Sequence, residues 1–378
     1  MHVALSLLTL FPGRSGGTET YARGLIGGLA RRNDGDPVTL LVSQRVQQAL
    51  GAPGLPMHHV SSYRTGNSAA TRLLAMICAG VAPRVVGRDV PAGIDVVHYP
   101  VTVPIPRIPG AAAVVSLNDV QHHELPAFFS APERVYRRSA YDAAARNADE
   151  VLTLSEHARR QIVQRLGIAP ERITAIPCAV DHVRFSPTPD EQDARADLPE
   201  RFLLYPANLW PHKNHARLLR AFARADVPEL TLLLTGQTYG RALPGAPSTR
   251  VRHLGLVAFE QLPALYRRAT ATIFPSLFEG FGMPLIEAMA CGCPVTASAR
   301  GAIAETCGDA ALLFDPEDEE AMADAIRRIA QDDALRERLR AAGLQRAAGF
   351  RWDDVAARHL EVYRRAFART DRAARRPR

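Results

Sequence analysis

The sequence contains almost no lysine. Of its 46 basic residues, 45 are arginine, and Lys213 is the only lysine. This bias indicates that arginine replaces lysine wherever the exchange is harmless, so that position 213 needs a compact ammonium group rather than a planar guanidinium. Binding of a phosphate group is a natural use for such a side chain. The alternative is that a single lysine survived by chance.

Cysteine is also scarce. The five cysteines are few and odd in number, which fits a reducing compartment better than a disulfide framework. Cys291 and Cys293 are separated by one residue, and no second cysteine or histidine pair stands at a zinc-binding spacing. We therefore expect small buried cysteines and no metal site.

Long apolar runs are missing from the chain. No stretch of about 18 apolar residues occurs, which excludes a transmembrane helix at the level of the sequence. The apolar segment 3–10 has no preceding Lys or Arg, so it predicts a first strand and its loop rather than a signal peptide. These absences predict a cytoplasmic protein.

The net charge of +7 is concentrated at the C-terminus. Residues 364–378 contain seven arginines and one aspartate, and the rest of the chain is close to neutral. A nucleic-acid-binding protein carries its positive charge on the folded body, so we expect no nucleic-acid partner. The favoured interpretation of the arginine run is a solvated terminus. The alternative is peripheral contact with anionic lipid headgroups at the inner membrane face, or with an acidic partner.

Short apolar runs alternate with segments of helical periodicity along the 378 residues. This alternation predicts an α/β protein with parallel sheets covered by helices on both faces. The length favours two domains. We therefore expect two Rossmann-like doubly wound domains that face a cleft. The predicted strands are 3–8, 38–42, 96–98, 113–117, 151–154 and 173–176 in the first domain, and 202–205, 230–235, 251–254, 271–274, 294–296 and 311–314 in the second.

The segment 185–199 is rich in Pro and Asp and interrupts the alternation near the middle of the chain. It predicts a first domain over 1–185 and a second over 186–351. Residues 352–368 predict one C-terminal helix that returns to the first domain, followed by a basic tail over 369–378. In open parallel sheets, ligands bind beyond the carboxyl ends of the strands, so the loops after the strands are where chemistry is expected.

The loop after the first strand contains Gly16 and Gly17 and opens a helix over 20–31. Glycines at a helix start let the backbone approach an anion, although a tight turn needed for packing explains them equally well. The spacing is not Gly-x-Gly-x-x-Gly, and the acidic residue of a dinucleotide site, expected about 20 positions later, does not stand out. A dinucleotide oxidoreductase is therefore disfavoured.

Two loops of the second half carry the charged residues. Lys213 follows the predicted strand 202–205, and Glu279 and Glu287 frame a helix start after the strand 271–274. Pro284 fits the first helical position, and the glycines before it leave amide groups to face a phosphate with the helix dipole behind them. Carboxylates beside such an anion site make sense as acceptors for hydroxyl groups on either side. An ordinary helix with two solvated acids is the alternative.

These residues resemble the family 4 retaining glycosyltransferases, which have the GT-B fold, over nearly the whole chain. The most specific match is the Glu-x7-Glu element, Glu279 to Glu287, within FPSLFEGFGMPLIEAMACGCPV. The Gly-Gly-Thr-Glu loop and the stretches TLSEHARRQI, IPCAVD and GDAALLFDPED add support and occur along the chain in the expected order. The stretch YPANLWPHKNH resembles a subset that includes many mannosyl- and rhamnosyltransferases.

The resemblance implies a role for each matched position. Glu287 would hold the ribose hydroxyls of a nucleotide, and Glu279 would orient the donor sugar. The other matched positions are expected around the same donor: Phe281 and Gly282 at the sugar, Met283, Leu285 and Lys213 at the diphosphate, Gly16 and Gly17 beneath the phosphates, and Leu256, Val257 and Leu262 at the base.

Two departures from the family pattern concern charge and the acceptor side. Asn208 stands where many members have an arginine, and a protonated His212 would compensate for the missing charge. Asn118 stands where many members have a histidine, and His122 would supply that imidazole from one turn along. His123 has a buried structural role as its alternative. The expected catalytic residues are thus His122, Glu279 and Lys213.

The resemblance further implies a metal-independent hexosyltransferase that retains the anomeric configuration and needs no cofactor besides its nucleoside-diphosphate sugar. GDP-mannose is the favoured donor, with UDP-hexoses and dTDP-rhamnose close behind. The acceptor would be a glycan, a lipid-linked sugar or a small molecule, as in polysaccharide biosynthesis. A GT-B-like sugar-nucleotide epimerase and a non-catalytic nucleotide-sugar-binding protein are the alternatives.

Overall fold

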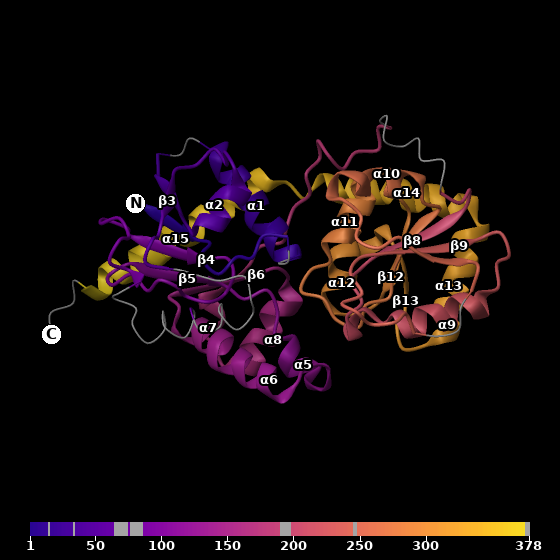
Figure 1. The fold of residues 1–378 in the computed structure, drawn as a ribbon, viewed down its shortest axis with the longest axis horizontal. Coiled ribbons are helices and arrows are strands. Elements are labelled where there is room, and N and C mark those ends of the chain that lie inside the picture. Colours follow the sequence, from indigo (N-terminus) through magenta and orange to yellow (C-terminus); the bar gives the residue numbers. More distant parts are fainter. Residues whose placement is uncertain are drawn as a thin grey trace. The chain divides into compact units, whose positions relative to one another are not determined.

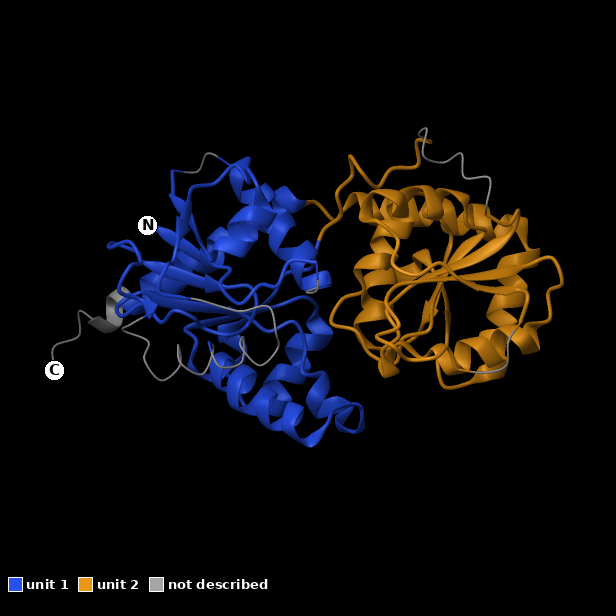
Figure 2. Ribbon diagram, viewed as in Figure 1, with its two compact units in different colours: residues 1–178, 352–378 blue, residues 179–351 orange. Residues whose placement is uncertain are grey.

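The computed structural model of the protein describes residues 1–13, 16–32, 35–63, 75, 86–189, 198–244 and 248–374, the last four by their backbone alone. These residues form two compact units, which Figure 2 colours separately. Unit 1 consists of residues 1–178 and 352–378, and unit 2 of residues 179–351. Each unit contains one parallel sheet with flanking helices (Figure 1), which confirms the predicted class of two doubly wound α/β domains.

Unit 1 contains a sheet with the strand order β3-β2-β1-β4-β5-β6-β7. Six of its strands overlap the six predicted runs, and β3 was missed. The β3 segment lies at the edge of the sheet, is three residues long and is not fully buried, so it carries no apolar run. The strands are β1 (Val3–Ser6), β2 (Val38–Val42), β3 (Met57–His59), β4 (Val96–Tyr99), β5 (Ala112–Ser116), β6 (Glu150–Thr153) and β7 (Ile173–Ala175).

Some helices of unit 1 begin and end at residues suited to those places. Ser155 caps one of them by accepting a hydrogen bond from the Ala158 amide at 3.1 Å, and Gly167 ends it in the left-handed conformation. The helices are α1 (Gly17–Ala30), α2 (Gln44–Leu50), α5 (Gln121–Glu124), α6 (Ala131–Arg137), α7 (Ala143–Asn147), α8 (Glu156–Leu166) and α15 (Trp352–Ala374), with a π-helical turn over Arg138–Asp142.

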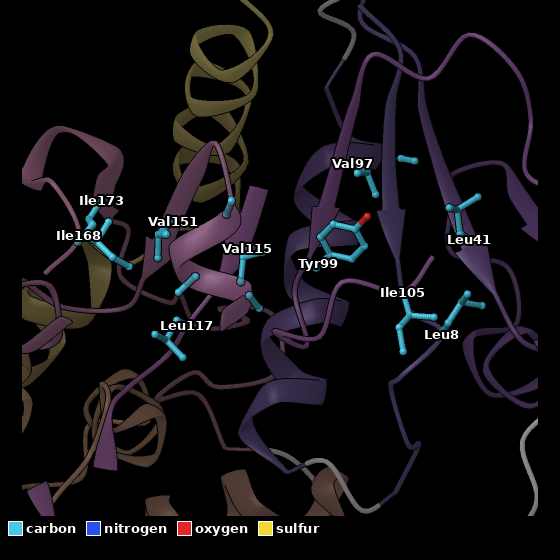
Figure 3. Close-up of a cluster of buried hydrophobic side chains, with 14 of the residues drawn as sticks. Leu8, Leu41, Val97, Tyr99, Ile105, Val115, Leu117, Val151, Ile168 and Ile173 are labelled. Carbon is cyan, nitrogen blue, oxygen red and sulfur yellow. The ribbon is translucent and has the colours of Figure 1, made fainter. Parts of the chain in front are cut away.

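One cluster of the unit 1 core, drawn in Figure 3, gathers buried side chains from several strands of this sheet. Tyr99, Val115 and Val151 come from three neighbouring strands and are almost completely buried. Burial of each such side chain contributes about 1.5–3 kcal/mol to stability. This core fixes the carboxyl ends of the strands, where the loops of interest begin.

Helix α15 belongs to unit 1, although it follows unit 2 in the chain. It packs against α1, where glycines make room for it: a Cβ at Gly24 would lie 2.1 Å from the Trp352 ring. A buried chain of hydrogen bonds also joins α15 to the sheet. The Val355 carbonyl at the end of this chain can only accept a hydrogen bond, and this sets which group donates in every bond. Tyr363 donates to His98, His98 donates to Ser116, and Ser116 donates to Tyr21. Tyr21 donates to His359 Nε2, and His359 Nδ1 donates to the Val355 carbonyl.

The predicted end of this helix at residue 368 is wrong, because α15 continues to Ala374. Arg365 and Arg369 form ion pairs with the buried Glu150, and Arg364 pairs with Asp36. This part of the arginine run therefore neutralises acids of unit 1 instead of forming a solvated tail. Residues 375–378 lie outside the described part of the chain. Among the helices that the structure describes, none combines the length and apolar character needed to cross a bilayer.

Unit 2 contains a sheet with the strand order β10-β9-β8-β11-β12-β13, and each of its six strands overlaps a predicted run. The strands are β8 (Phe202–Pro206), β9 (Thr231–Thr235), β10 (Val251–His253), β11 (Ala271–Phe274), β12 (Val295–Ser298) and β13 (Leu312–Phe314). The helices are α9 (His215–Ala225), α10 (Leu262–Arg268), α11 (Met283–Ala290), α12 (Gly301–Cys307), α13 (Glu319–Gln331) and α14 (Asp333–Ala348).

The boundary between the units differs from the predicted one. The sequence predicts residues 179–185 in the first domain, but they belong to unit 2. The reason is Phe185, which is 2% exposed and packs with its ring 5.5 Å from Phe259 and 6.2 Å from Tyr266, both in unit 2. The Pro- and Asp-rich pattern after residue 185 did not reveal this anchor.

Candidate functional site

The loops after β8 and β11 lie side by side, because these strands are neighbours in the sheet of unit 2. Several hydrogen bonds join the two loops. The Leu277 amide donates to the His212 carbonyl at 2.8 Å, and the Asn214 side chain donates to the Pro275 carbonyl at 3.1 Å. From the strand beneath, the Tyr205 hydroxyl donates to the Lys213 carbonyl at 2.7 Å. The backbone that carries the solitary lysine is thereby fixed against the loop that leads into α11.

Lys213 and Glu279 meet at this junction. Lys213 Nζ lies 2.5 Å from Glu279 Oε1 and 5.3 Å from the centre of the Phe274 ring. Their side chains are 16% and 14% exposed, so both groups are partly shielded yet reachable. The sequence predicts a phosphate contact for one residue and a sugar contact for the other. Their ion pair places the two predicted contacts beside each other.

The start of α11 is built by Gly282, whose backbone is left-handed with φ 100°. A Cβ there would lie 2.7 Å from Leu285 Cδ1, so any other residue would be both strained and crowded. The helix begins at Met283, which makes Pro284 its second residue rather than the predicted first. The Leu285 amide, predicted to bind phosphate, already donates to the Gly282 carbonyl at 3.0 Å.

Hydrogen bonds from other parts of unit 2 hold Phe281 and Glu287 in place. Phe281 is buried, and its carbonyl accepts a hydrogen bond from the Thr306 hydroxyl at 2.8 Å. Glu287 is 6% exposed and accepts one from the Tyr266 hydroxyl at 3.2 Å. Burial raises the pKa of Glu287 to about 7, although the hydrogen bond from Tyr266 acts in the opposite direction. This carboxyl group therefore changes its charge near neutral pH.

Asn208 organises the loops after β8 and β9. Its Oδ1 accepts a hydrogen bond from the Gln237 amide at 2.8 Å, and its Nδ2 donates to the Tyr239 hydroxyl at 3.2 Å. The side chain expected near phosphate is thus engaged within the protein. His212 is half-buried in the same loop as Lys213.

The residues predicted for the base lie after β10. Val257 and Leu262 are half-buried, Leu256 is 69% exposed, and Leu262 is the first residue of α10. The surface at this place is apolar and partly exposed, as the flat face of a base requires.

The glycine loop lies in unit 1, at the start of α1. Gly16 precedes the helix with φ 49°, and Gly17 is its first residue. The Glu19 carboxylate accepts a hydrogen bond from the Gly13 amide at 2.7 Å and pairs with Arg23. The Glu19 carboxylate thus already accepts the hydrogen bond of one backbone amide in this loop. Arg14 and Ser15 lie outside the described residues.

The acceptor-side loop of unit 1 differs from its prediction. His122 is 0% exposed and His123 is 16% exposed, so the histidine expected to reach a sugar is the more buried of the two. Each donates from Nε2 to one oxygen of Asp142, at 3.0 and 2.8 Å. Burial lowers the pKa of His122, and Asp142 only partly opposes this effect. His122 is therefore neutral and closed to solvent in this structure.

This cluster has the composition of a metal site, and its atoms lie within 4.8 Å of one another. The two hydrogen bonds to Asp142 account for the arrangement without an ion. His122 Nδ1 also has no partner among the described residues, whereas a metal-bound histidine normally donates from its second nitrogen. The buried Asn118 Oδ1 likewise has no hydrogen-bond partner among the described residues. Two acceptor atoms of this loop therefore lack a donor within the described part of the chain.

Two residues that shape these sites, Tyr266 and Asp142, are not marked by any pattern in the sequence. About 20 residues of chain separate each of them from its hydrogen-bond partner. Each lies on a helix or helical turn that packs on another element. Neither spacing nor periodicity encodes such a contact. The π-helical turn that ends at Asp142 has no sequence mark that we recognise.

Comparison with known proteins covers both units. The model of "Glycosyltransferase Family 4" matches residues 15–184, and that of "Glycosyl transferases group 1" matches residues 188–346. The O-antigen chain mannosyltransferase B of Escherichia coli is 30% identical over 267 residues, which cover 67% of this chain and 70% of the relative. A D-inositol 3-phosphate glycosyltransferase of Catenulispora acidiphila is 31% identical over 329 residues, covering 76% and 77%. An MMP alpha-(1->4)-mannosyltransferase of Mycolicibacterium hassiacum is 31% identical over 239 residues, but the match spans only 56% of its length.

Solved structures agree with these matches at the level of the fold. The sucrose-phosphate synthase of Thermosynechococcus elongatus has a TM-score of 0.77 at 24% identity and covers 97% of this chain and 99% of its own. The Anabaena protein HepE, in complex with UDP and glucose, has a TM-score of 0.70 at 17% identity, covering 96% and 98%. Together the family models, the relatives and the fold establish that the chain belongs to the family 4 glycosyltransferases and has their GT-B fold.

Proposed function

We propose that the protein transfers a hexose from a nucleoside-diphosphate sugar to a hydroxyl group of a glycan, lipid-linked or small-molecule acceptor, with retention of anomeric configuration. The observation that carries this proposal is the contact between Lys213 and Glu279 at the start of α11. One group suits a diphosphate, the other suits sugar hydroxyls, and a donor contains both within a few ångströms.

The exchange of partners on donor binding is energetically reasonable. A partly exposed ion pair contributes about 0–1 kcal/mol. A charge-assisted hydrogen bond from Lys213 to phosphate contributes about 1.5–3 kcal/mol, and Glu279 would accept a hydroxyl of the sugar in its place. Glu287, which lies further along α11, would accept a ribose hydroxyl of the nucleotide.

The chemical step would be attack from the same face as the leaving group. The acceptor oxygen forms a bond to the anomeric carbon as the bond to the β-phosphate oxygen breaks, and the acceptor proton passes to that phosphate. Lys213 and the amide groups at the start of α11 would stabilise the charge that develops on the leaving diphosphate. We expect these groups to suffice without a metal ion.

GDP-mannose is the donor we favour, with UDP- and dTDP-sugars as alternatives. Two relatives bear mannosyltransferase names, and the WPHKNH stretch resembles that subset. A thermal-shift screen with GDP, UDP, dTDP and their sugars, followed by a transfer assay with anomeric analysis of the product, tests the proposal. Stabilisation by GDP and an α-linked product from GDP-mannose would support it. Donor turnover without an acceptor would indicate an epimerase, and binding without turnover or slow hydrolysis would indicate a binding protein.

A further inference from the structure

Tyr266 is a buried residue of α10 that reaches the predicted ribose carboxylate. Helix α10 packs directly on α11, and the Tyr266 ring is completely buried between this helix pair and Phe185. Its hydroxyl lies 3.2 Å from Glu287 Oε2. A buried tyrosine hydroxyl costs free energy unless it finds a partner, so this bond fixes both side chains.

The Glu287 carboxylate is only half satisfied. Tyr266 is its hydrogen-bond donor among the residues that the structure describes, and it serves Oε2. Oε1 has no such donor, and Glu287 as a residue keeps 6% of its surface exposed. A buried carboxylate with one oxygen fixed and one oxygen open is arranged to accept a hydrogen bond from outside the protein.

We propose that Tyr266 is a positioning residue of the nucleotide site: its hydroxyl holds Oε2 of Glu287 and leaves Oε1 to accept a ribose hydroxyl. The proposal rests on the proposed function, since Glu287 must face a nucleotide. It adds a second, buried layer to that site, from helix α10. Discrimination between ribose and deoxygenated sugars would then depend on a residue that never touches the ligand.

The surroundings make Glu287 the group that titrates near neutral pH. Burial raises the pKa of Cys293 to about 12 and that of Tyr266 well above its usual value, so both stay uncharged. Cys291 lies near Tyr266, and Arg340 of α14 is the charged side chain close to Cys293. Because the Tyr266 hydroxyl favours the ionised form of Glu287, its loss raises the pKa of that carboxyl above about 7.

The test is isothermal titration of the full chain with GDP and UDP, and with their 2′,3′-dideoxy analogues, between pH 6 and 9. For the wild type we expect affinity to rise through neutral pH and to favour the ribonucleotide. Tyr266→Phe should weaken ribonucleotide binding at pH 7 about tenfold, equivalent to ~1.4 kcal/mol. It should move the pH midpoint upward and reduce the preference over the dideoxy analogue. Unchanged affinity, midpoint and preference would overturn the proposal.

Two controls separate positioning from a general loss of stability. Tyr99→Phe removes another buried hydroxyl, which donates to the Pro106 carbonyl in unit 1, and it should leave nucleotide binding unchanged. In a Glu287→Gln background, Tyr266→Phe should have little further effect on ribose preference; a full effect there would contradict the proposal even if the single variant is unstable. Failure of the wild type to bind any of these nucleotides would refute the proposed function itself. Normal ribose preference in both wild type and Tyr266→Phe would refute only this inference.

Discussion

The two units present their candidate site residues in opposite states. In unit 2, Lys213 and Glu279 lie on loops joined by backbone hydrogen bonds, and both side chains remain partly exposed. In unit 1, His122 is completely buried, held by Asp142, and its second nitrogen lacks a partner among the described residues. The predicted donor site is thus preformed, whereas His122, the residue predicted to face the acceptor, is closed to solvent.

The difference follows from how each loop is supported. The unit 2 loops leave neighbouring strands, and hydrogen bonds from Leu277 and Asn214 join them to each other. The unit 1 loop passes through the four-residue helix α5, and its buried acceptors Asn118 Oδ1 and His122 Nδ1 are unsatisfied within the described chain. Each such group costs about 1–3 kcal/mol, so a rearrangement that supplies donors would lower the free energy of this loop.

The largest effect is expected from Glu279→Gln. The change removes the carboxylate that we propose accepts the sugar hydroxyls, and it also frees Lys213, so kcat should fall about 100-fold or more while the Kd for GDP stays similar or tightens. Steady-state kinetics and titration measure the two quantities. Glu319→Gln, at a surface ion pair of unit 2, is the matched control. An equal loss in kcat and in GDP affinity would contradict the sugar-side role.

We expect the stability of unit 2 to depend on pH. Burial raises the pKa of Glu287 from 4.5 to about 7, so the folded state binds more protons than the unfolded state between these values. The contribution of Glu287 to stability therefore falls as pH rises from about 4.5 to about 7 and is constant above. Glu287→Gln should gain stability relative to wild type by up to ~3 kcal/mol across this window. Urea unfolding at pH 5 and pH 8 measures the difference, and a constant offset would show that Glu287 titrates normally.

Lys213→Ala should weaken GDP binding by about 1.5–3 kcal/mol through loss of a charge-assisted contact. Lys213→Arg tests the need for a compact ammonium, and we expect it to restore only part of the affinity. Arg220→Ala removes an exposed cation of α9 and serves as control. Wild-type affinity in Lys213→Ala, measured by titration, would remove the lysine from the site.

Asp142→Asn should affect unit 1 alone. One histidine would lose its acceptor, so the free energy of unfolding should fall by ~1–2 kcal/mol while GDP affinity is unchanged. Chemical denaturation and titration of the same preparation give both values. A change in GDP affinity at unchanged stability would contradict the expectation that Asp142 affects unit 1 alone.

The smallest effect is expected from removal of residues 371–378. The truncation keeps Arg365 and Arg369 on the buried Glu150, so melting temperature and transfer to soluble acceptors should be unchanged. Truncation before Arg369 should be less stable, since it removes one of these partners. Equal losses in both truncations would place a structural role beyond residue 370.

The sequence predicted the fold because apolar runs mark buried parallel strands directly. It missed β3, which is short and lies at an edge, and it placed the unit boundary too late because the anchor is a single phenylalanine, Phe185. The loops of Lys213 and Glu279 were found from residue type and position. Their direct contact spans 66 residues and depends on β8 and β11 being neighbours, which no local pattern encodes.

The acceptor side was predicted less well for a related reason. A sequence indicates that His122 and His123 stand near a strand end, but which of them turns inward depends on the distant Asp142. Tyr266 escaped notice in the same way, since a buried aromatic residue at helical spacing ordinarily signifies core packing. Residues that act through another side chain leave no motif of their own.

A crystal structure of the full chain with bound GDP tests the central claim most directly. We predict that an oxygen of the β-phosphate lies within about 3 Å of Lys213 Nζ and beside the first turn of α11, with the contact between Lys213 and Glu279 lengthened. A nucleotide bound elsewhere on the chain, or a diphosphate at this helix with Lys213 still paired to Glu279 and out of its reach, would contradict the account.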